Sequence, residues 1–327
     1  MFYRCKNCGG NVLYDPDKKK MVCDSCQSED SAQLIRQEKF HICNNCGGQL
    51  EVGEHTLAAR CPYCKTSIIL EDRMEEAYEP HLVLPFQIDK HKAAEFLLKK
   101  FKGKLFLPAN FCSASSLESM EGIYVPFWMY DFHTSIYFEG EGDKIRVWRE
   151  GDYECTETRV YRIIRDFTVD YERIPVDASI SRENGLMDLI EPYQYGSLFN
   201  FSPEFLSGFE AETWEEDKEQ LRDRAEQKAN TYSEQYLNDF IGNYDAVRSF
   251  QKKRTNEGKE TNYAFLPMWH YVYHYNGKNY EFYVNGQTGK AIGSAPVSIG
   301  KAFAMSAAVF GSVFFFLRML CFFLEVI

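Results

Sequence analysis

Hydrophobic and polar positions alternate over long stretches in the middle of the chain. Apolar and aromatic side chains dominate IYVPFWMYDFHTSIYFEG (123–140), and between Tyr161 and Tyr171 the odd positions are mainly apolar while the even positions are mainly polar. A period of two is typical of strands with one buried face. Farther along, NG at 276–277 separates two aromatic runs and predicts a hairpin, and NGQTGK at 285–290 predicts a turn into a third short strand.

Two other stretches follow a helical period. In residues 89–104, Ala93 and Leu97 lie four positions apart, and Asp89 is placed to cap the first turn. Residues 212–253 carry an apolar stripe opposite a face of Glu, Lys and Arg, which predicts an amphipathic helix packed on a sheet. Antiparallel strands with packed helices place the chain in the α+β class.

A weaker internal similarity lies within the strands. YVPFWMY at 124–130 and FLPMWHY at 265–271 share an apolar–Pro–apolar–Trp core with a closing Tyr. Two explanations stay open: a duplicated half-sheet, or two similar strand entries.

The last stretch, 302–327, is apolar without a period. Its sequence, AFAMSAAVFGSVFFFLRMLCFFLEVI, contains only two charged residues, and about 20 apolar residues suffice to cross a bilayer. We expect one transmembrane helix, with Arg318 extending to the far interface. Ala304, Ala308 and Ser312 are spaced for close helix association in lipid, so a homo-oligomer through this helix is one expectation, and ordinary membrane filler is the other.

Cysteine spacing is the strongest chemical signal. CKNCGGNVLYDPDKKKMVCDSC (5–26) and CNNCGGQLEVGEHTLAARCPYC (43–64) share two Cys-x-x-Cys pairs, a Gly-Gly after the first pair, and the same gap. Zinc prefers four thiolates in a tetrahedron, and so short a loop depends on the roughly 10–16 kcal/mol of metal binding for its fold. We predict two structural Zn²⁺ sites per chain, with iron in a rubredoxin-like knuckle as the chemical rival. The predicted ligands are Cys5, Cys8, Cys23 and Cys26 in the first site and Cys43, Cys46, Cys61 and Cys64 in the second.

These patterns divide the chain into five parts. The acidic run EDRMEEAYEP, which ends in Pro80, is typical of a boundary. The predicted parts are zinc ribbon 1 (1–30), zinc ribbon 2 (39–70), an acidic linker (71–81), an α+β core domain (82–296) and a transmembrane anchor (302–327).

Charge argues against nucleic acid as the main partner. The whole chain has a formal net charge of −11. Residues 1–70 contain nine Lys/Arg and eight Asp/Glu, and two zinc sites at −2 each bring this region from +1 to about −3. Phosphate contacts dominate nucleic-acid affinity, so an acidic ribbon pair is a poor candidate. The lysine run at 18–20 is one basic tip, which we interpret as a solvated turn.

The sequence contains no recognisable catalytic signature, and we expect a non-enzymatic protein. NGQTGKA lacks the spacing of a phosphate-binding loop. Asp131 and His133 fall on one face of a predicted strand without a third partner, so we assign them structural roles. Cys112 and Cys155 lie outside any nucleophile motif, so we expect them to be buried as small hydrophobes.

Compartment and topology follow from the thiols and the flanking lysines. The N-terminus, MFYRCKNC, has no apolar signal-peptide segment, and thiol-rich metal sites suit a reducing compartment. Lys290 and Lys301 precede the apolar helix and favour an inside N-terminus. We expect a single-pass cell-membrane protein whose bulk is cytoplasmic.

The ribbons, followed by LVLPFQIDKHKA, GIYVPFWMYDF, RVWREGDYECTETRVYR, LMDLIEPYQY and FYVNGQTGKAIG, resemble a family of zinc-ribbon membrane proteins of Gram-positive bacteria. Its members are described as TFIIB-type zinc-ribbon-containing proteins, and some are labelled primosomal helicases, a label that no motif in this chain supports. The resemblance implies a membrane-anchored cytosolic protein without established catalysis. It also implies protein partners of the phage-shock-protein-A-like or SPFH type.

Together these patterns predict a membrane-anchored scaffold or adaptor whose ribbons dock partner proteins at the inner membrane face. The alternative is a membrane-tethered, nucleic-acid-binding regulator related to transcription. An unrecognised ligand site in the aromatic core is a third hypothesis, which a deep pocket with convergent polar groups would favour.

Overall fold

The structure is a computed structural model, and its described residues cover the first cysteine motif and most of the second, of the core and of the apolar helix. Most of the predicted acidic linker (71–81) and Cys112 lie outside the described residues. The described ranges are 1–36, 42–43, 45–50, 52–70, 73–74, 79–108, 110–111, 117–180 and 184–325.

The predicted α+β class is confirmed, with most of the chain built on one large sheet. This sheet has ten strands, and its central path runs β10-β7-β12-β8-β11-β5-β6. The strands are β1 (Phe2–Cys5), β2 (Val12–Asp15), β3 (Lys20–Cys23), β4 (Ala32–Ile35), β5 (Thr56–Arg60), β6 (Ser67–Ile69), β7 (Leu82–Val83), β8 (Glu121–Glu150), β9 (Tyr153–Asp177), β10 (Phe199–Asn200), β11 (Glu210–Glu212), β12 (Ala246–Tyr275), β13 (Lys278–Asn285) and β14 (Ala291–Gly293). The helices are α2 (Lys90–Phe101), α4 (Asn184–Ile190), α5 (Arg222–Ile241) and α6 (Ile299–Glu325), with 3₁₀ turns η1 (Tyr195–Ser197) and η2 (Pro203–Leu206).

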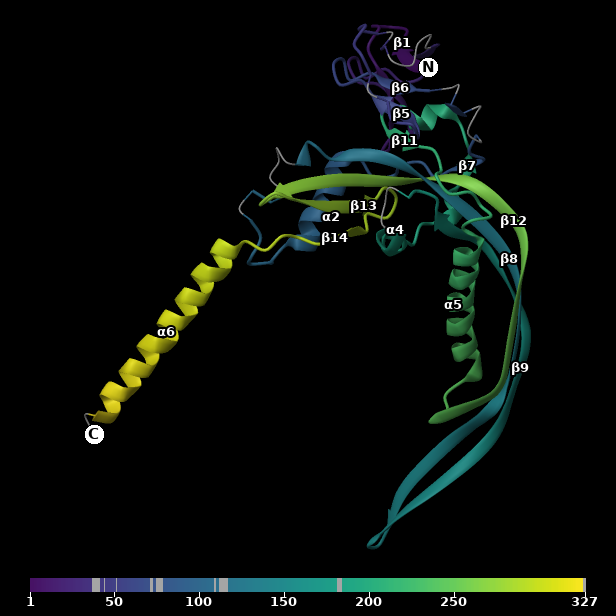
Figure 1. Ribbon diagram of the computed structural model, residues 1–327, viewed down its shortest axis with the longest axis vertical. Coiled ribbons are helices and arrows are strands. Elements are labelled where there is room, and N and C mark those ends of the chain that lie inside the picture. Colours follow the sequence, from purple (N-terminus) through teal and green to yellow (C-terminus); the bar gives the residue numbers. More distant parts are fainter. Residues whose placement is uncertain are drawn as a thin grey trace.

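Three very long strands give the molecule its shape. β8, β9 and β12 leave the core together and bend into a curved arm, and α5 lies on its inner side (Figure 1). The alternating pattern expected for 123–140 and 161–171 is therefore confirmed, but β8 runs ten residues beyond the end of its stretch and β9 runs farther in both directions. Beneath α5, Ile136, Phe138 and Ile163 of the arm form a separate buried cluster with Leu237 and Ile241 of the helix.

The helix predicted over 212–253 is wrong at both ends. It spans only Arg222–Ile241, and Gly242, at φ +89°, ends it. Left-handed backbone of this kind is open to glycine at little cost and terminates helices. The chain then enters β12, where Ala246 pairs with Asp143 of β8. The shorter helix α2 is confirmed, with Asp89 accepting a hydrogen bond from the Lys92 amide at 2.7 Å.

The predicted hairpin and third strand are also confirmed. Asn276 and Gly277 have φ of +50° and +73°, the conformation of a two-residue primed turn. They join β12 to β13, with Tyr275 opposite Lys278. The NGQTGK segment then turns into β14.

The core consists of two units with the same order of elements. The first runs β7-α2-β8-β9 and the second runs β11-α5-β12-β13. Val83 of β7 lies parallel to Phe265 of β12, and Ala211 of β11 lies parallel to Tyr124 of β8. Tyr124 and Phe265 are the first residues of the two similar sequence segments. The short strand of each unit, β7 or β11, therefore pairs with the same position in the long strand of the other unit.

Side-chain contacts follow the same equivalence. Trp128 donates its indole N–H to the carbonyl of Glu216, and Trp269 donates to the carbonyl of Ile88, both at 2.9 Å. The residue that follows each accepting carbonyl is an aspartate just before a helix. Asp217 accepts a hydrogen bond from the backbone amide three residues later at 2.8 Å, and Asp89 accepts one in the same way before α2. These matched contacts favour duplication as the origin of the sequence similarity.

The two cysteine motifs attach to this core differently. In the first, β1 pairs with β4 and β2 pairs with β3, in two separate two-stranded sheets. In the second, β5 and β6 are strands of the large sheet, because Ala58 of β5 pairs with Ala211 of β11. The sequence-based division into parts stays a prediction, but the second motif shares its backbone hydrogen bonds with the core.

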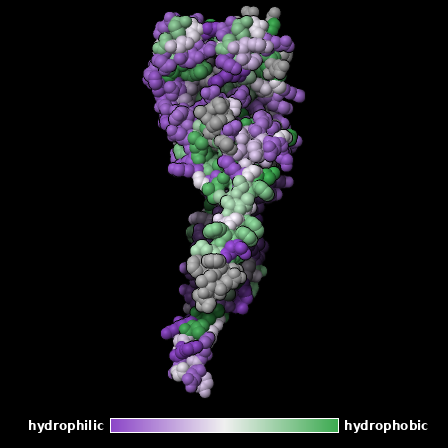
Figure 2. All heavy atoms as spheres, turned by 90° about the vertical axis from the view of Figure 1, so that its left-hand side faces the viewer, coloured by the Kyte–Doolittle hydropathy of each residue, from purple (hydrophilic) through white to green (hydrophobic). Residues whose placement is uncertain are grey.

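The C-terminal helix α6 projects away from the rest of the molecule (Figure 1). The part of this helix from Ile299 to Leu320, 22 residues long, has a mean hydropathy of 1.8, and 0% of its most apolar window is buried. Apolar side chains run down the face of this helix seen in Figure 2. The helix is long and apolar enough to cross a membrane.

Candidate metal centres

The first cysteine group is assembled from two tight turns at strand ends. β1 ends at Cys5, where the Cys5 amide donates to the carbonyl of Gly10 and the Gly9 amide donates to the carbonyl of Cys5, both at 2.9 Å. β3 ends at Cys23, whose amide donates to the carbonyl of Ser28 at 3.0 Å. Each turn thereby directs two sulfur atoms toward the other turn.

The sulfur atoms lie at distances suited to a single metal ion. Sγ of Cys5 and Cys26 are 3.7 Å apart, and those of Cys8 and Cys23 are 3.5 Å apart. All four sulfur atoms lie within 4.8 Å of one another. Zinc–sulfur bonds of about 2.3 Å at tetrahedral angles place sulfur atoms about 3.8 Å apart. The group can therefore hold a zinc ion with little movement.

The second group has the same geometry. Sγ of Cys43 and Cys64 are 3.6 Å apart, those of Cys46 and Cys61 are 3.8 Å apart, and all four lie within 4.8 Å of one another. The eight cysteines singled out in the sequence thus gather as two groups of four.

Backbone conformation repeats between the groups as well. Gly9 and Gly47 both have φ of +74°, and Gln27 and Lys65 both have φ of +59°. Each pair of residues is separated by 38 positions, which is also the offset between Cys5 and Cys43. The left-handed backbone at Gly9 and Gly47 explains the first glycine of each Gly-Gly.

Burial of the thiols points to a bound cation. Cys5, Cys23, Cys43 and Cys61 are all buried. Burial raises the pKa of the Cys43 thiol to about 12, because a thiolate in this position loses hydration. A dication restores the balance by favouring the charged form, so four converging thiols, half of them buried, fit a metal site.

Hydroxyl groups beside the sulfur atoms are a feature that the sequence reading missed. Ser28 and Ser31 lie 3.3 and 3.2 Å from the Cys5 sulfur, and their hydrogen bonds lower the pKa of this thiol to about 5. In the second group, the Thr66 hydroxyl lies 3.2 Å from the sulfur of Cys64. The signal was present, because a Ser or Thr stands two positions after the last cysteine of each motif.

The other residues considered in the sequence do not form a third site. Asp131 accepts from the Arg173 amide at 2.7 Å, whereas His133 pairs with Asp170 at 2.8 Å, so both contact β9 and not each other. Cys155 was expected to be buried, but it is only partly buried, because it lies on the arm beyond the end of α5.

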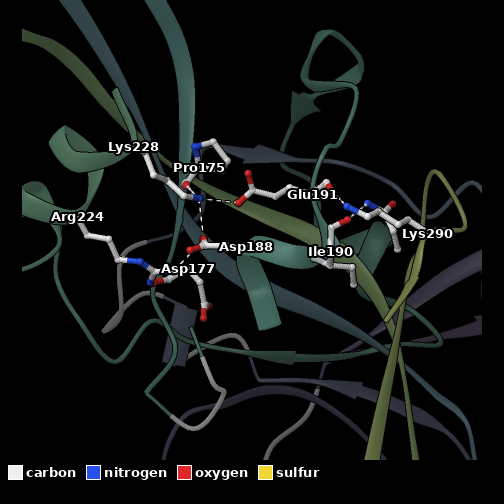
Figure 3. Close-up of polar contacts among 9 residues, drawn as sticks. Pro175, Asp177, Asp188, Ile190, Glu191, Arg224, Lys228 and Lys290 are labelled. Atoms are coloured by element: carbon white, nitrogen blue, oxygen red, sulfur yellow. Dashed lines mark hydrogen bonds and ion pairs between the residues drawn. The ribbon is translucent and has the colours of Figure 1, made fainter. Parts of the chain in front are cut away.

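A polar cluster beneath α5 fixes the neighbouring loop. The Lys228 ammonium donates to the carbonyl of Pro175 and the carboxylate of Glu191, both at 2.7 Å, and pairs with Asp188 at 2.8 Å (Figure 3). Arg224 also binds Asp188, at 2.9 Å. Burial raises the pKa of Glu191. Lys228 thereby joins α5 to β9, to α4 through Asp188 and to Glu191 after α4.

Comparison with known proteins yields one informative relative. No family model matches the chain, and no solved structure matches it, so the relation to TFIIB-type zinc-ribbon proteins stays a prediction. The uncharacterized protein YdjG of Bacillus subtilis strain 168 is 33% identical over 328 residues, which cover 97% of this chain and 96% of that protein. An identity of this size across both full lengths shows common descent and a common fold. The chain therefore belongs to the family of Bacillus subtilis YdjG.

Proposed function

We propose that the protein is a membrane-anchored, non-catalytic scaffold whose ribbons dock partner proteins. The observation that carries the proposal is the contrast between the two ends of the chain. One end holds two groups of four cysteines, and the other is an apolar helix with 0% of its membrane-length window buried. A metal-stabilised surface tethered to a membrane suits recruitment of another protein.

Zinc in both groups would have a structural role. Four cysteine ligands fill a tetrahedral coordination sphere and leave no position for a substrate or water. The ion would hold the turns at Cys5–Cys8 and Cys23–Cys26 together, and the equivalent turns of the second group, in place of a large hydrophobic core.

The docking surface proposed here centres on Tyr63. This side chain is 68% exposed and lies between Cys61 and Cys64, on a turn fixed by the metal ligands. A Cβ built on Gly48 would lie 2.4 Å from the Tyr63 ring, so the ring rests directly on the backbone of the opposite turn. A rigid, exposed aromatic side chain is the type of residue that dominates protein–protein interfaces. The equivalent position in the first motif is Ser25.

The family resemblance suggests phage-shock-protein-A-like or SPFH-type proteins as partners. The proposed location is the cell membrane, crossed once by α6, with the N-terminus and bulk of the chain in the cytoplasm. Thiol-rich metal sites, together with Lys290 before α6 and Lys301 in its first turn, support this topology.

The nucleic-acid alternative has less support. Lys18 and Lys20, the basic tip of the first motif, each lie 3.3 Å from the Glu29 carboxylate, which reduces the charge they offer to a phosphate. Phosphate-dominated binding would show a steep salt dependence. Salt-sensitive binding of DNA or RNA by the full chain would favour this alternative over a protein scaffold.

Crosslinking in native membranes, followed by identification of the captured proteins, tests the scaffold. We expect one set of proteins to be captured by the natural chain and by Ser25→Ala, and lost with Tyr63→Ala. Equal capture by both variants would contradict docking at Tyr63. Fractionation is a separate test: removal of 302–327 should release the chain from the membrane, and continued membrane association would contradict the anchor.

A further inference from the structure

Two segments of this acidic chain contain no Asp or Glu, and the fold brings them together. One is 96–117, which covers the second half of α2 and the loop after it, and the other is 282–324, which covers β14 and nearly all of α6. The chain as a whole has 48 Asp and Glu against 37 Lys and Arg. Where these two segments meet, the local surface is positively charged, although the chain as a whole is negatively charged.

Hydrogen bonds fix the meeting point at the start of α6. The Ser298 amide, just before the helix, donates to the carbonyl of Phe106 at 2.7 Å. The Lys100 ammonium donates to the carbonyl of Ala291 at 2.6 Å. Burial, with Lys104 and Lys290 nearby, lowers the pKa of Lys100, which agrees with a cluster of cations. In Figure 1 the end of α2 and its following loop lie beside the first turn of α6.

The surface at this point combines lysines with exposed apolar side chains. Leu105 is 65% exposed and Ile299 is 72% exposed. Lys104 lies over the ring of Phe101, at 4.7 Å from its centroid. We call the exposed residues Lys99, Lys102, Lys104, Leu105 and Lys301 the juxtamembrane patch.

Helix stability alone does not account for these lysines. Cations at a helix C-terminus interact favourably with its dipole, which is the simplest explanation for Lys99 and Lys102. The core duplication supplies a control: α5 is the equivalent helix of the second unit, and both helices end before a glycine of positive φ, +85° at Gly103 and +89° at Gly242. The last turn of α5 carries Asp239 and no lysine. A single cation, Arg165 of β9, donates there to the carbonyls of Phe240 at 2.8 Å and Ile241 at 3.5 Å, so one cation suffices for this helix end whereas the end of α2 carries several.

We propose that the juxtamembrane patch binds the phosphate headgroups of anionic lipids in the membrane that α6 crosses. This inference rests on the proposed membrane anchor, since α6 places the patch at the lipid surface. Lysine ammonium groups pair with headgroup phosphates, while Leu105 and the first turn of α6 contact the upper acyl region. Lysine clusters next to a transmembrane helix gain roughly fivefold in lipid affinity per lysine.

Lysine labelling of the full chain in vesicles tests the patch directly. The chain is reconstituted in phosphatidylcholine vesicles with and without about 30 mol% phosphatidylglycerol, and labelling by an amine reagent is read by peptide mass spectrometry. We expect Lys99, Lys102 and Lys104 to react at least about fivefold more slowly with phosphatidylglycerol present. Lys19, on the first cysteine motif, should react at the same rate in both. Equal rates at the patch in the two vesicle types would overturn the proposal.

Variants give a second measure. K99Q/K102Q/K104Q should retain at least about tenfold less phosphatidylglycerol per chain after detergent extraction, whereas the matched triple variant K18Q/K19Q/K20Q should retain the natural amount. Equal retention by the two variants would also overturn the proposal. Flotation with pure phosphatidylcholine vesicles isolates the anchor: a chain that fails to float refutes the membrane helix, and a chain that floats without lipid selectivity refutes only the patch.

Discussion

The two cysteine motifs have nearly identical metal-binding geometry but different attachments to the core. Gly9 and Gly47 share a φ of +74°, and two Sγ–Sγ distances in each group lie between 3.5 and 3.8 Å. The first motif forms its own small sheets, whereas the second continues the large sheet through β11. The same local chemistry therefore occurs in a motif that packs its side chains into the main core and in a motif whose strands extend the core sheet.

The packing of β6 shows that the second motif contributes to two hydrophobic clusters. Ile68 belongs to a small cluster with Cys43 and Cys61, and the adjacent Ile69 belongs to the main core. Successive strand residues point to opposite faces, so one three-residue strand joins the metal group to the core of the protein. Loss of the second metal is expected to disturb the core sheet, and loss of the first to disturb the side-chain packing around Cys5 and Cys23.

Cysteine removal should show the largest difference. Cys61→Ser should lower the free energy of unfolding of the core by about 4 kcal/mol or more, because β5 and β6 lose the metal that holds them. Cys23→Ser, its equivalent in the first motif, should cost less, because the first motif packs on the main core through side chains and adds no strand to the large sheet. Denaturant unfolding followed by tryptophan fluorescence measures both. Equal losses in the two variants would contradict the difference in attachment.

Glycine substitution should show the equivalence of the metal sites. Gly9→Ala and Gly47→Ala each place a side chain in left-handed backbone, and no atom lies within 4 Å of either added Cβ. The cost should therefore be conformational, about 1–2 kcal/mol of zinc binding at the affected site. Competition with a zinc chelator provides the measurement. A large effect at one site and none at the other would show that the two turns are not equivalent.

A hydroxyl group provides a smaller test that again separates the motifs. The Thr66 hydroxyl lies 3.0 Å from the Asn11 side-chain oxygen of the first motif and 2.6 Å from the Asn45 amide nitrogen. Thr66→Val should cost about 1 kcal/mol and speed amide hydrogen exchange in both motifs. Ser28→Ala, the equivalent change, should affect the first motif only. If Thr66→Val speeds amide exchange only in the second motif, the proposed link between the two motifs through Thr66 is contradicted.

The smallest effect is expected at an ion pair between the first motif and α2. Asp17 and Lys92 lie 2.6 Å apart, and this hydrogen bond lowers the pKa of Asp17. A carboxylate whose pKa is lowered in the folded state stabilises the fold at pH values above its unfolded pKa of about 4. This stabilisation is lost as the pH falls through the folded pKa. Asp17→Asn should cost less than about 1 kcal/mol at neutral pH, since both groups are largely exposed. The difference from the natural chain should shrink as pH falls below the unfolded pKa and through the folded pKa, and a difference that stays constant in acid would argue against an ionic contact.

Local patterns predicted some parts of this molecule well and others not at all. Cysteine spacing identified both four-cysteine groups, since each depends on one short turn and its partner. Alternation identified β8 and β9 but not the length of the arm, because the outer arm is exposed on both faces and loses its apolar period. The helical composition of 242–253 concealed the start of β12, whose pairing with β8 outweighs local propensity.

Attachment of the second motif could not have been predicted from its own residues. It depends on β11, a strand of three residues, Glu210–Glu212, far away in sequence. Such a segment carries too little pattern for a strand prediction. The juxtamembrane patch had the same difficulty, because its two segments, 96–117 and 282–324, are separated by 164 residues and only the fold brings them together.

Metal analysis of the full chain tests the central claim most directly. Elemental analysis of protein purified without added metal should give two zinc ions per chain, with one zinc ion remaining in Cys23→Ser. The single zinc ion in that variant should resist chelation until the core unfolds, because the second motif shares its backbone with the core sheet. A ratio near one zinc in the natural chain, or iron in place of zinc, would contradict the account.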